Sequence, residues 1–320
     1  MAAPFKIAML GAGRIGEIHA ELLAHRVPGV EVAGVFDLDP DRAAAVASAT
    51  ESRNFRSLAA ALSSDVDAVC IATSTDSHLA VLKEAVRAGK HILCEKPVSL
   101  EVEMVDEGLA MVDAAGVLLQ VGFNRRFDPG HKAVADAVAD GRVGEPQLIR
   151  ITSRHPAPPS LEYIVASGGI FTDMSIHDFD MARYVTQSDV VEVYAAGAVL
   201  VDAAIGEVGD IDSAAITLTH ADGAMTQIDN SRQAVYGYDQ RVEVFGSKGV
   251  AVSEGPTTTS LQERYADSYV DQWRAFAAAA QQGTASPVSG ADGRASLVVA
   301  KAAALSFAEN RPVRIDELDF

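Results

Sequence analysis

Two residues with complementary acid–base chemistry, Asp173 and His177, lie four positions apart in a largely apolar stretch of the sequence. On a helix this spacing places both side chains on one face. A carboxylate beside an imidazole can fix the tautomer of the ring and stabilise its protonated form. The neighbours Phe171, Met174 and Phe179 predict that the helix is largely buried, which disfavours an ordinary solvated ion pair. We therefore expect a general base here that takes a proton from a hydroxyl group.

A lysine follows the apolar run 91–94, at Lys96, and Pro97 comes directly after it. If the run is a parallel strand, Lys96 leaves the sheet at its carboxyl end, where ligands bind in such sheets. A lysine there can orient a substrate oxygen and pass a proton. Pro97 is compatible with a tight turn and a cis peptide bond. From the residues alone, a surface lysine at the end of a strand is an equally good interpretation.

A GxGxxG motif occupies residues 11–16, directly after an apolar run and directly before a helical pattern. Gly11 permits the tight turn, Gly13 lets a pyrophosphate approach the backbone, and Gly16 allows close packing of helix on strand. The first N–H groups of the helix then face the phosphates. In this context the motif predicts a dinucleotide site.

An acidic residue, Asp37, ends the next predicted strand, as the dinucleotide motif requires. Its carboxylate can accept hydrogen bonds from both hydroxyls of the adenosine ribose, and it repels the extra phosphate of NADP. The next residues, Leu38 and Asp39, supply no cation that would offset this repulsion. We therefore expect NAD as the cofactor and NADP less readily, with Arg42 keeping dual use open.

The elements that must position these residues alternate between strand and helix in the first part of the chain. Nearly continuous apolar runs predict strands at 5–10, 30–36, 66–72, 91–94 and 117–123. Helical patterns between them cover 14–25, 77–88 and 100–115, and a further helix is predicted to begin at 39–41. Repeated units of this kind predict an α/β domain with the doubly wound parallel sheet of the Rossmann fold, over residues 1–122.

Residues 123–320 have a different pattern, which predicts a substrate-binding and oligomerisation domain of the α+β class. Several segments alternate apolar and polar residues, as expected for a mostly antiparallel open sheet. Strands are predicted at 147–154, 190–199, 213–220, 224–231 and 241–245, with a hairpin turn at 221–223. Helices are predicted at 131–140, 269–282 and 291–309, and the last helix could pack back on the first domain.

Composition excludes several classes of protein. The 320 residues are 48% hydrophobic and 22% charged, which is ordinary globular composition, and the formal charge is −18. An acidic chain repels phosphate backbones and anionic lipids, so we expect neither nucleic-acid nor membrane binding. The N-terminus lacks the pattern of a signal peptide. Cys70 and Cys94, each within an apolar run, predict buried thiols, no metal site and a cytoplasmic location.

Several of these segments together resemble the glucose–fructose oxidoreductase/inositol dehydrogenase family (Gfo/Idh/MocA). With the glycine loop, the matching motifs are Glu95-Lys96-Pro97 and the run from Thr73 to His78. Residues 168–180 look like the catalytic helix of the inositol dehydrogenase members, and 122–128 and 236–246 are similar too. The resemblance covers nearly the whole chain.

The resemblance implies a role for individual residues. His177 would be the base, Asp173 its partner and Lys96 the donor to the substrate oxygen. From their spacing, Asp180 and Tyr184 continue the helix face of Asp173 and His177, and we expect them to support this pair or to contact another subunit. The residues expected to bind the cofactor are Gly11, Gly13, Arg14, Ile15, Asp37, Thr73, Ser74, His78, Glu95 and Lys96. The residues expected to bind substrate are Lys96, Asn124, Arg126, His155, Asp173, His177 and Tyr236.

The activity that the resemblance implies is oxidation of a secondary hydroxyl of a cyclic polyol or sugar, myo-inositol or a stereoisomer, to the ketone with NAD. Open alternatives are a glycoside hydrolase or dehydratase that uses NAD transiently, and a sugar (aldose) 1-dehydrogenase. A non-catalytic NAD sensor is disfavoured, because it needs no proton relay. Family members associate through the C-terminal sheet, so we expect a homo-oligomer, either a dimer or a tetramer.

Overall fold

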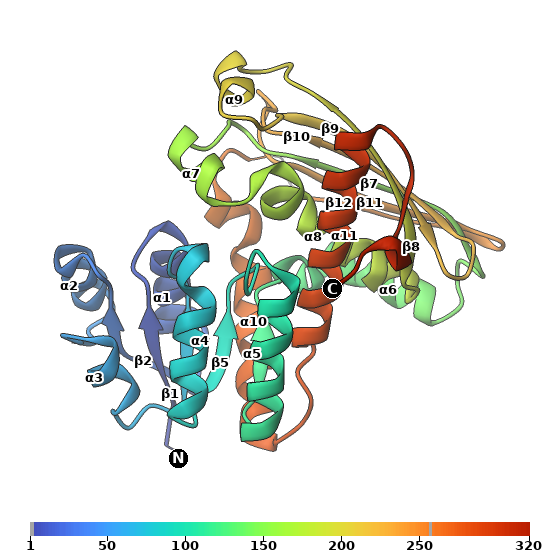
Figure 1. The fold of residues 1–320 in the computed structure, drawn as a ribbon. Helices are drawn as coiled ribbons and strands as arrows, with labels where there is room; N and C mark the ends of the chain where they lie inside the picture. The colour runs from blue at the N-terminus through green and yellow to red at the C-terminus, as the bar shows by residue number, and fades with distance from the viewer. Residues whose placement is uncertain (1–2, 256–257) are drawn as a thin grey trace. The chain divides into compact units, whose positions relative to one another are not determined.

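Contacts between residues divide the chain into two compact units in the computed structural model, which describes residues 3–255 and 258–320 (Figure 1). Unit 1 comprises Met1–Asn124 and Asp267–Arg294, and unit 2 comprises Arg125–Ala266 and Ala295–Phe320. The predicted nucleotide-binding range 1–122 thus leaves out a later segment of unit 1. That segment carries the buried side chains of Trp273 and Phe276, and the ring of Phe276 lies 6.3 Å from that of Phe5.

Unit 1 is built on a parallel sheet, as predicted. Its strand order is β3 (Arg53–Asn54), β2 (Val30–Phe36), β1 (Phe5–Leu10), β4 (Ala68–Ile71), β5 (His91–Cys94) and β6 (Leu119–Val121). The central strands are almost entirely buried, which explains their unbroken apolar runs. Every strand points the same way, so the loops that follow them gather at one edge of the sheet.

The helices of unit 1 include two closely packed pairs. Their bounds are α1 (Arg14–Arg26), α2 (Pro40–Ala49), α3 (Leu58–Leu62), α4 (His78–Arg87), α5 (Val102–Ala115) and most of α10 (Leu261–Gln282). Helices α4 and α5 pack closely at Gly108, where an added Cβ would lie only 2.8 Å from the side chain of Leu79. Helix α1 instead contacts α10, where the rings of His19 and Trp273 lie 5.5 Å apart.

Local sequence signals begin and end several of these helices. The side chain of Asp39 accepts hydrogen bonds from the N–H groups of Asp41 and Arg42, and Pro40 begins α2, as the sequence predicts. Gly116 ends α5 with a φ of +64°. Strand β3 is not predicted from the sequence, since Arg53 and Asn54 are exposed and carry no apolar pattern, and the short helix α3 is not predicted either.

Unit 2 contains a seven-stranded sheet. Its order is β12 (Gly249–Glu254), β11 (Asp239–Gly246), β7 (Pro146–Arg154), β10 (Met225–Ser231), β9 (Ser213–His220), β8 (Val190–Ala198) and β13 (Val313–Arg314). Strands β7 and β10 are parallel, and every other described pair is antiparallel. Strands β9 and β10 form the predicted hairpin. Strands β12 and β13, at the two edges of the sheet, are not predicted from the sequence.

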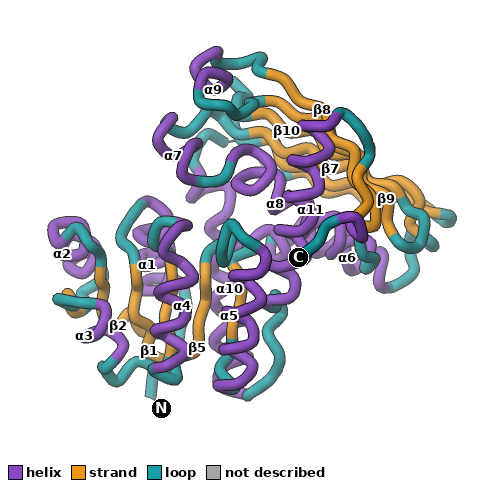
Figure 2. Tube along the Cα trace, viewed as in Figure 1, coloured by secondary structure: helices purple, strands orange, loops and turns teal. Residues whose placement is uncertain are grey.

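Among the described residues, helices cover one face of this sheet and not the other (Figure 2). The helices of unit 2 are α6 (Pro129–Ala139), α7 (Leu161–Ala166), α8 (Ile176–Thr186), α9 (Ala203–Glu207) and most of α11 (Gly290–Glu309). Side chains of α6, α8 and α11 form the core with one face of the strands. The other face exposes large apolar side chains, which we call the open sheet face: Leu148, Tyr194, Met225, Phe245, Val250 and Val252. Among the described residues, no helix is long and apolar enough to cross a membrane.

Candidate active site

The glycine loop lies between β1 and α1 and leaves room for a ligand at its middle glycine. Gly11 has a φ of +104°, and a Cβ there would lie 2.3 Å from the carbonyl oxygen of Ala72. A Cβ at Gly16 would lie 2.1 Å from the carbonyl oxygen of Gly11. A Cβ at Gly13, in contrast, would meet nothing within 4 Å among the described residues. The two outer glycines are thus required by packing, while the open space at Gly13 fits the approach of a pyrophosphate.

The carboxylate of Asp37 is fixed beside this loop at the end of β2. It accepts hydrogen bonds from the N–H of Ala12 at 2.6 Å and from the N–H of Asp39 at 2.8 Å. Nη2 of Arg42 lies 3.5 Å from one of its oxygens. The predicted ribose acceptor is therefore held in place by the backbone of the loop that would hold the pyrophosphate. These residues together fit a dinucleotide.

The segments after β4 and β5 are joined by His78. Its two ring nitrogens lie 2.8 Å from the carbonyl oxygen of Pro97 and 3.1 Å from that of Thr73. The Lys96–Pro97 peptide bond is cis. From Ile92 to Val98, Lys96 is the one residue that is not buried, so its side chain leaves the strand end toward the surface of unit 1.

Glu95 is held by a buried histidine that the sequence analysis did not identify. Oε1 of Glu95 lies 2.8 Å from Nε2 of His19, and the indole N–H of Trp273 donates to Nδ1 of His19 at 2.9 Å. Because an indole N–H can only donate, Nδ1 must accept, and Nε2–H therefore donates to Glu95. The carboxylate of Glu95 also abuts Gly122, where a Cβ would lie 2.9 Å from it. These contacts tie the residue before Lys96 to α1 and α10.

In unit 2, Asp173 lies on a π-helical turn, Phe171–Ser175, that runs directly into α8. Such turns widen a helix locally and are frequent at functional sites. The hydroxyl of Tyr163 donates to one oxygen of Asp173 at 2.9 Å. Nη1 of Arg232 donates to the other oxygen at 3.3 Å. Both oxygens of the buried carboxylate are thus engaged by side chains from other segments.

His177 occupies the first turn of α8. From Ile170 to Ala182 it is the one residue that is not buried. The imidazole of His177 is therefore the one side chain of this segment that remains partly accessible. The next residue, Asp178, is completely buried, and its carboxylate accepts from Arg125 at 2.5 Å and from the side-chain N–H of Asn230 at 2.8 Å. Burial raises the pKa of Asp178, and the Arg125 charge opposes that shift. This network fixes the turn that carries His177.

Arg126 forms a two-pronged ion pair with Asp180 in α8. Its Nε and Nη2 donate to the two carboxylate oxygens at 2.8 and 2.6 Å, and its guanidinium lies 5.1 Å from the ring centre of Tyr184. Asp180 is 1% exposed, so this is a buried pair rather than a surface one. Asp180 and Tyr184 therefore support a residue that the resemblance assigns to substrate binding.

The remaining predicted substrate residues have partners within their own units. Asn124 donates to the hydroxyl of Ser268 at 3.1 Å and is 3% exposed. Tyr236 is about half exposed, and its hydroxyl donates to Asp239 at 2.8 Å and accepts from Arg154 at 3.0 Å. His155 makes an edge contact with Tyr238, with ring centres 5.4 Å apart. These three roles remain predictions.

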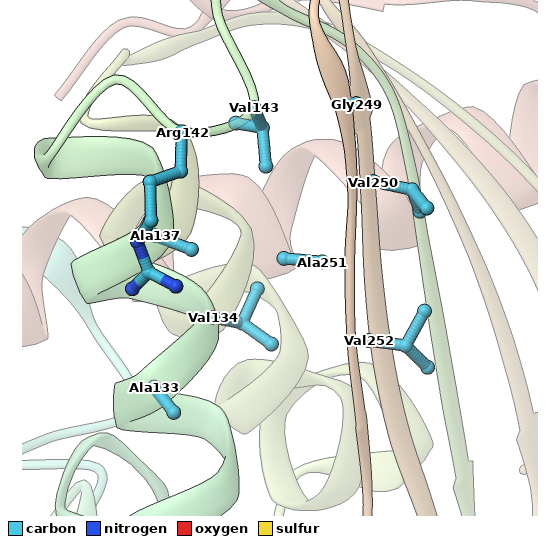
Figure 3. A pocket seen from close by; sticks show the side chains of 9 residues that line it. All are labelled: Ala133, Val134, Ala137, Arg142, Val143, Gly249, Val250, Ala251 and Val252. Carbon is cyan, nitrogen blue, oxygen red and sulfur yellow. The ribbon is translucent and has the colours of Figure 1, made fainter.

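A cavity of about 310 Å³ lies elsewhere in unit 2, between α6 and β12 (Figure 3). Val134 from the helix and Ala251 from the strand face each other across it, and Arg142 adds the one charged side chain of its lining. Its lining residues are Ala133, Val134, Ala137, Arg142, Val143, Gly249, Val250, Ala251 and Val252. The predicted site residues all lie elsewhere, so this cavity is separate from the candidate active site.

The described residues offer no candidate metal site. Among the described residues, no cluster of His, Cys, Asp or Glu side chains is arranged to hold a metal ion. Cys70 and Cys94 are completely buried free thiols, and burial raises the pKa of both. Neither thiol is suited to be a nucleophile, since the reactive form is the thiolate.

Comparison with known proteins identifies the family. The model of an oxidoreductase family with an NAD-binding Rossmann fold matches residues 5–123, and that of the GFO/IDH/MocA C-terminal domain matches residues 131–252. The chain belongs to the GFO/IDH/MocA oxidoreductase family. The predicted family, fold class and NAD-binding Rossmann domain are thereby confirmed.

Relatives of this GFO/IDH/MocA protein match it over almost their full length. The chain is 44% identical to the inositol 2-dehydrogenase of Rhizobium meliloti, with 97% of this chain and 99% of the relative covered. It is 42% identical to the myo-inositol 2-dehydrogenase of Thermotoga maritima, with 98% and 99% covered. A crystal structure of scyllo-inositol dehydrogenase from Lactobacillus casei with NAD(H) and scyllo-inositol has a TM-score of 0.90 at 26% identity, and covers 98% of this chain and 99% of its own.

Several residues that hold the predicted site residues in place were not predicted from the sequence: His19 and Trp273 in unit 1, and Tyr163, Asp178, Asn230 and Arg232 in unit 2. Most of them are polar residues at buried positions, where the only sequence signal was their presence among apolar neighbours. Trp273 had a clearer signal, because it is the single tryptophan of the chain. Their partners come from distant segments, such as His19 and Trp273, so spacing could not reveal them.

Proposed function

We propose that this protein oxidises a secondary ring hydroxyl of myo-inositol, or of a stereoisomer, to the ketone with NAD. The observation that carries the proposal is the identity of 42–44% to inositol dehydrogenases over almost the whole chain. The lysine, aspartate and histidine that this chemistry requires are all present, at Lys96, Asp173 and His177.

The roles of these three residues follow from their chemistry and surroundings. Bound NAD supplies the acceptor for the hydride of the ring C–H. His177 takes the proton of the hydroxyl, because its imidazole stands out from a buried helix and can change charge near neutral pH. Asp173 stabilises the protonated imidazole and is itself held by Tyr163 and Arg232. Lys96 donates to the substrate oxygen as it becomes a carbonyl.

NAD would bind to the glycine loop and to the segments after β2, β4 and β5. We propose that the residues of this site are Gly11, Gly13, Arg14, Ile15, Asp37, Thr73, Ser74, His78, Glu95 and Lys96. The fixed carboxylate of Asp37 favours NAD over NADP, since a 2′-phosphate placed there would meet a negative charge. Arg42, at 3.5 Å from Asp37, partly offsets that repulsion.

A polyol presents many hydroxyls, so its pocket must be polar. We propose that Asn124, Arg126, His155 and Tyr236 add substrate contacts to those of Lys96, Asp173 and His177. The exact orientation of Arg126 depends on Asp180, which holds two of its N–H donors.

We also propose that the protein works as a homodimer or homotetramer in the cytoplasm. The open sheet face exposes six large apolar side chains, and apolar patches of this kind mark protein interfaces. Both cysteines are buried thiols, which suits a reducing compartment. A single protomer has a mass of 33.6 kDa, so light scattering that gives about this mass in solution would contradict the oligomer.

The activity is tested by NADH absorbance with a panel of inositols and aldoses. We expect turnover of at least one inositol that exceeds turnover of every aldose. Release of sugar from a glycoside without net NADH would instead indicate a hydrolase that uses NAD transiently. Absence of turnover with every inositol, in protein shown to bind NAD, would overturn the proposal.

A further inference from the structure

A completely buried arginine, Arg232, lies behind the carboxylate of Asp173. It directly follows β10, and its backbone N–H donates to the carbonyl of Asp212 at 2.8 Å. Its side chain is 0% exposed. Nη1 lies 3.3 Å from Oδ2 of Asp173, and Nη2 lies 3.1 Å from Oδ2 of Asp210. A guanidinium cannot lose its charge in a protein, so its burial depends on these two carboxylates.

The carboxylate of Asp210 holds the start of the helical segment that carries Asp173. Oδ1 of Asp210 accepts a hydrogen bond from the N–H of Ile170 at 3.1 Å. Gly169, with a φ of +80°, permits this approach, because a Cβ there would lie 3.0 Å from Oδ1 of Asp210. A closed ring of contacts therefore runs from the backbone of Ile170 through Asp210 and Arg232 to Asp173, three residues further along the chain.

The other oxygen of the Asp173 carboxylate is held as well. The hydroxyl of Tyr163 in α7 donates to its Oδ1 at 2.9 Å. The nearby Asp212 does not compete for Arg232, because its carboxylate accepts from the N–H groups of residues 200–202. The charged or titratable groups around Arg232 are thus Asp173 and Asp210, with Tyr163 on the far side of Asp173 and His177 on the next turn of the helix.

We propose that Arg232 is a positioning residue that acts through Asp173: it holds this carboxylate ionised and fixes its orientation toward the helix that carries His177. The inference rests on the proposed function, in which Asp173 is the partner of the base. Without the guanidinium, a buried carboxylate is easier to protonate and can rotate. Asp173 then stabilises a protonated imidazole less well during proton transfer.

The experiment compares Arg232→Met and Arg232→Lys with the wild type, using NAD and the best inositol substrate. Removal of a cation raises the pKa of neighbouring groups, so the acidic limb of the pH–rate profile should move upward by roughly one pH unit in Arg232→Met. We expect kcat to fall by about 10- to 100-fold, in line with the loss of an oriented acid–base group, and the KM for NAD to stay unchanged. Arg232→Lys keeps the charge and should restore the position of the limb.

Two further variants separate positioning from mere stability. Arg264→Met removes another buried arginine of unit 2, which pairs with Asp128 at 2.6 Å, and should lower the melting temperature without moving the acidic limb. Asp210→Asn removes an anion next to Arg232 and should move the limb downward, opposite to Arg232→Met. If Arg232→Met does not fold, Arg232→Lys and Asp210→Asn carry the test.

The outcomes are distinct. Limbs at the wild-type position in both Arg232→Met and Asp210→Asn would overturn the inference, even if both variants are less stable. If the wild type oxidises no inositol at all, the proposed function fails instead. The inference is then tested by an NMR titration of the Asp173 carboxyl in the NAD-free protein: an upward shift of its pKa in Arg232→Met supports the inference, and an unchanged titration overturns it.

Discussion

The indole N–H of Trp273 donates to Nδ1 of His19 at 2.9 Å, and this contact decides which nitrogen of His19 faces Glu95. The three residues come from α10, α1 and the end of β5, and all three are buried. Because His19 can then donate only through Nε2, Glu95 receives a hydrogen bond from a neutral ring. Trp273 thus selects the tautomer of His19, and this tautomer holds Glu95, the residue before Lys96.

Trp273→Phe tests this relationship. The substitution keeps an aromatic ring in the core but leaves Nδ1 of His19 without its donor. We expect the free energy of unfolding to fall by about 1–3 kcal/mol, the usual cost of a buried polar group left without its partner. Chemical denaturation measures it, and Phe276→Leu serves as a control for the change in aromatic packing. Equal stability of the wild type and Trp273→Phe would show that the hydrogen bond is unimportant.

Asp37→Ser tests the preference for NAD. The carboxylate that would repel a 2′-phosphate disappears, while Arg42 remains nearby as a cation. We expect kcat/KM for NADP to rise relative to that for NAD by about 10-fold or more, since the effect of one close charge is of order 1.4 kcal/mol or larger. Asp41→Asn, on the exposed surface of α2, is the control and should leave the ratio unchanged. An unaltered ratio in Asp37→Ser would rule out the specificity role.

The pair of Arg126 and Asp180 allows structural and substrate roles to be separated. Arg126→Met leaves a buried carboxylate without its cation, so we expect a loss of about 3–5 kcal/mol in the free energy of unfolding. The double variant Arg126→Met/Asp180→Leu removes both charges and should recover much of that stability. If Arg126 also contacts substrate, the double variant keeps a raised KM for inositol. A double variant with a wild-type KM would remove Arg126 from the substrate site.

The stability of the protein should depend on pH through His131. Burial lowers the pKa of this histidine to about 4 from its ordinary value of 6.5. Between these values the unfolded chain binds a proton that the folded chain does not, so stability is lost as pH falls from 6.5 to 4, at up to roughly 1.4 kcal/mol per pH unit.

His131→Gln isolates this effect from the other buried histidines. His131 contacts the hydroxyl of Ser253 at 2.9 Å, and glutamine can keep a hydrogen bond there without titrating. Denaturation midpoints measured from pH 7 to pH 4 should fall less steeply in His131→Gln than in the wild type. Parallel curves would assign the acid sensitivity to other groups.

Much of the fold follows from local sequence patterns, because each strand and helix of a doubly wound sheet carries its own periodicity. Strands β1, β2 and β5 have the predicted bounds, and Asp39 caps α2 as predicted. The short strand β3 escaped prediction, since two exposed polar residues carry no period. The membership of 267–294 in unit 1 escaped it too, because it depends on tertiary contacts such as that of Phe276 with Phe5.

The candidate site is predictable only where a motif fixes the backbone. Gly11, Gly13 and Gly16 could be assigned from their spacing, and their different surroundings agree with the separate reasons for each glycine. The partners of Asp173 could not, because Tyr163 lies on a short helix that was not predicted and Arg232 lies 59 positions away. Pairing between distant polar residues leaves no period in the sequence.

We propose that His177 and Lys96 act on the same alcohol during NAD-dependent oxidation of an inositol. The most direct test of this proposal is the kcat for NADH formation by His177→Ala and Lys96→Met, with NAD binding measured in each variant. We expect a fall of about 10²- to 10⁴-fold in His177→Ala and a large fall in Lys96→Met, while both variants still bind NAD. A wild-type rate of NADH formation in either variant would contradict the account.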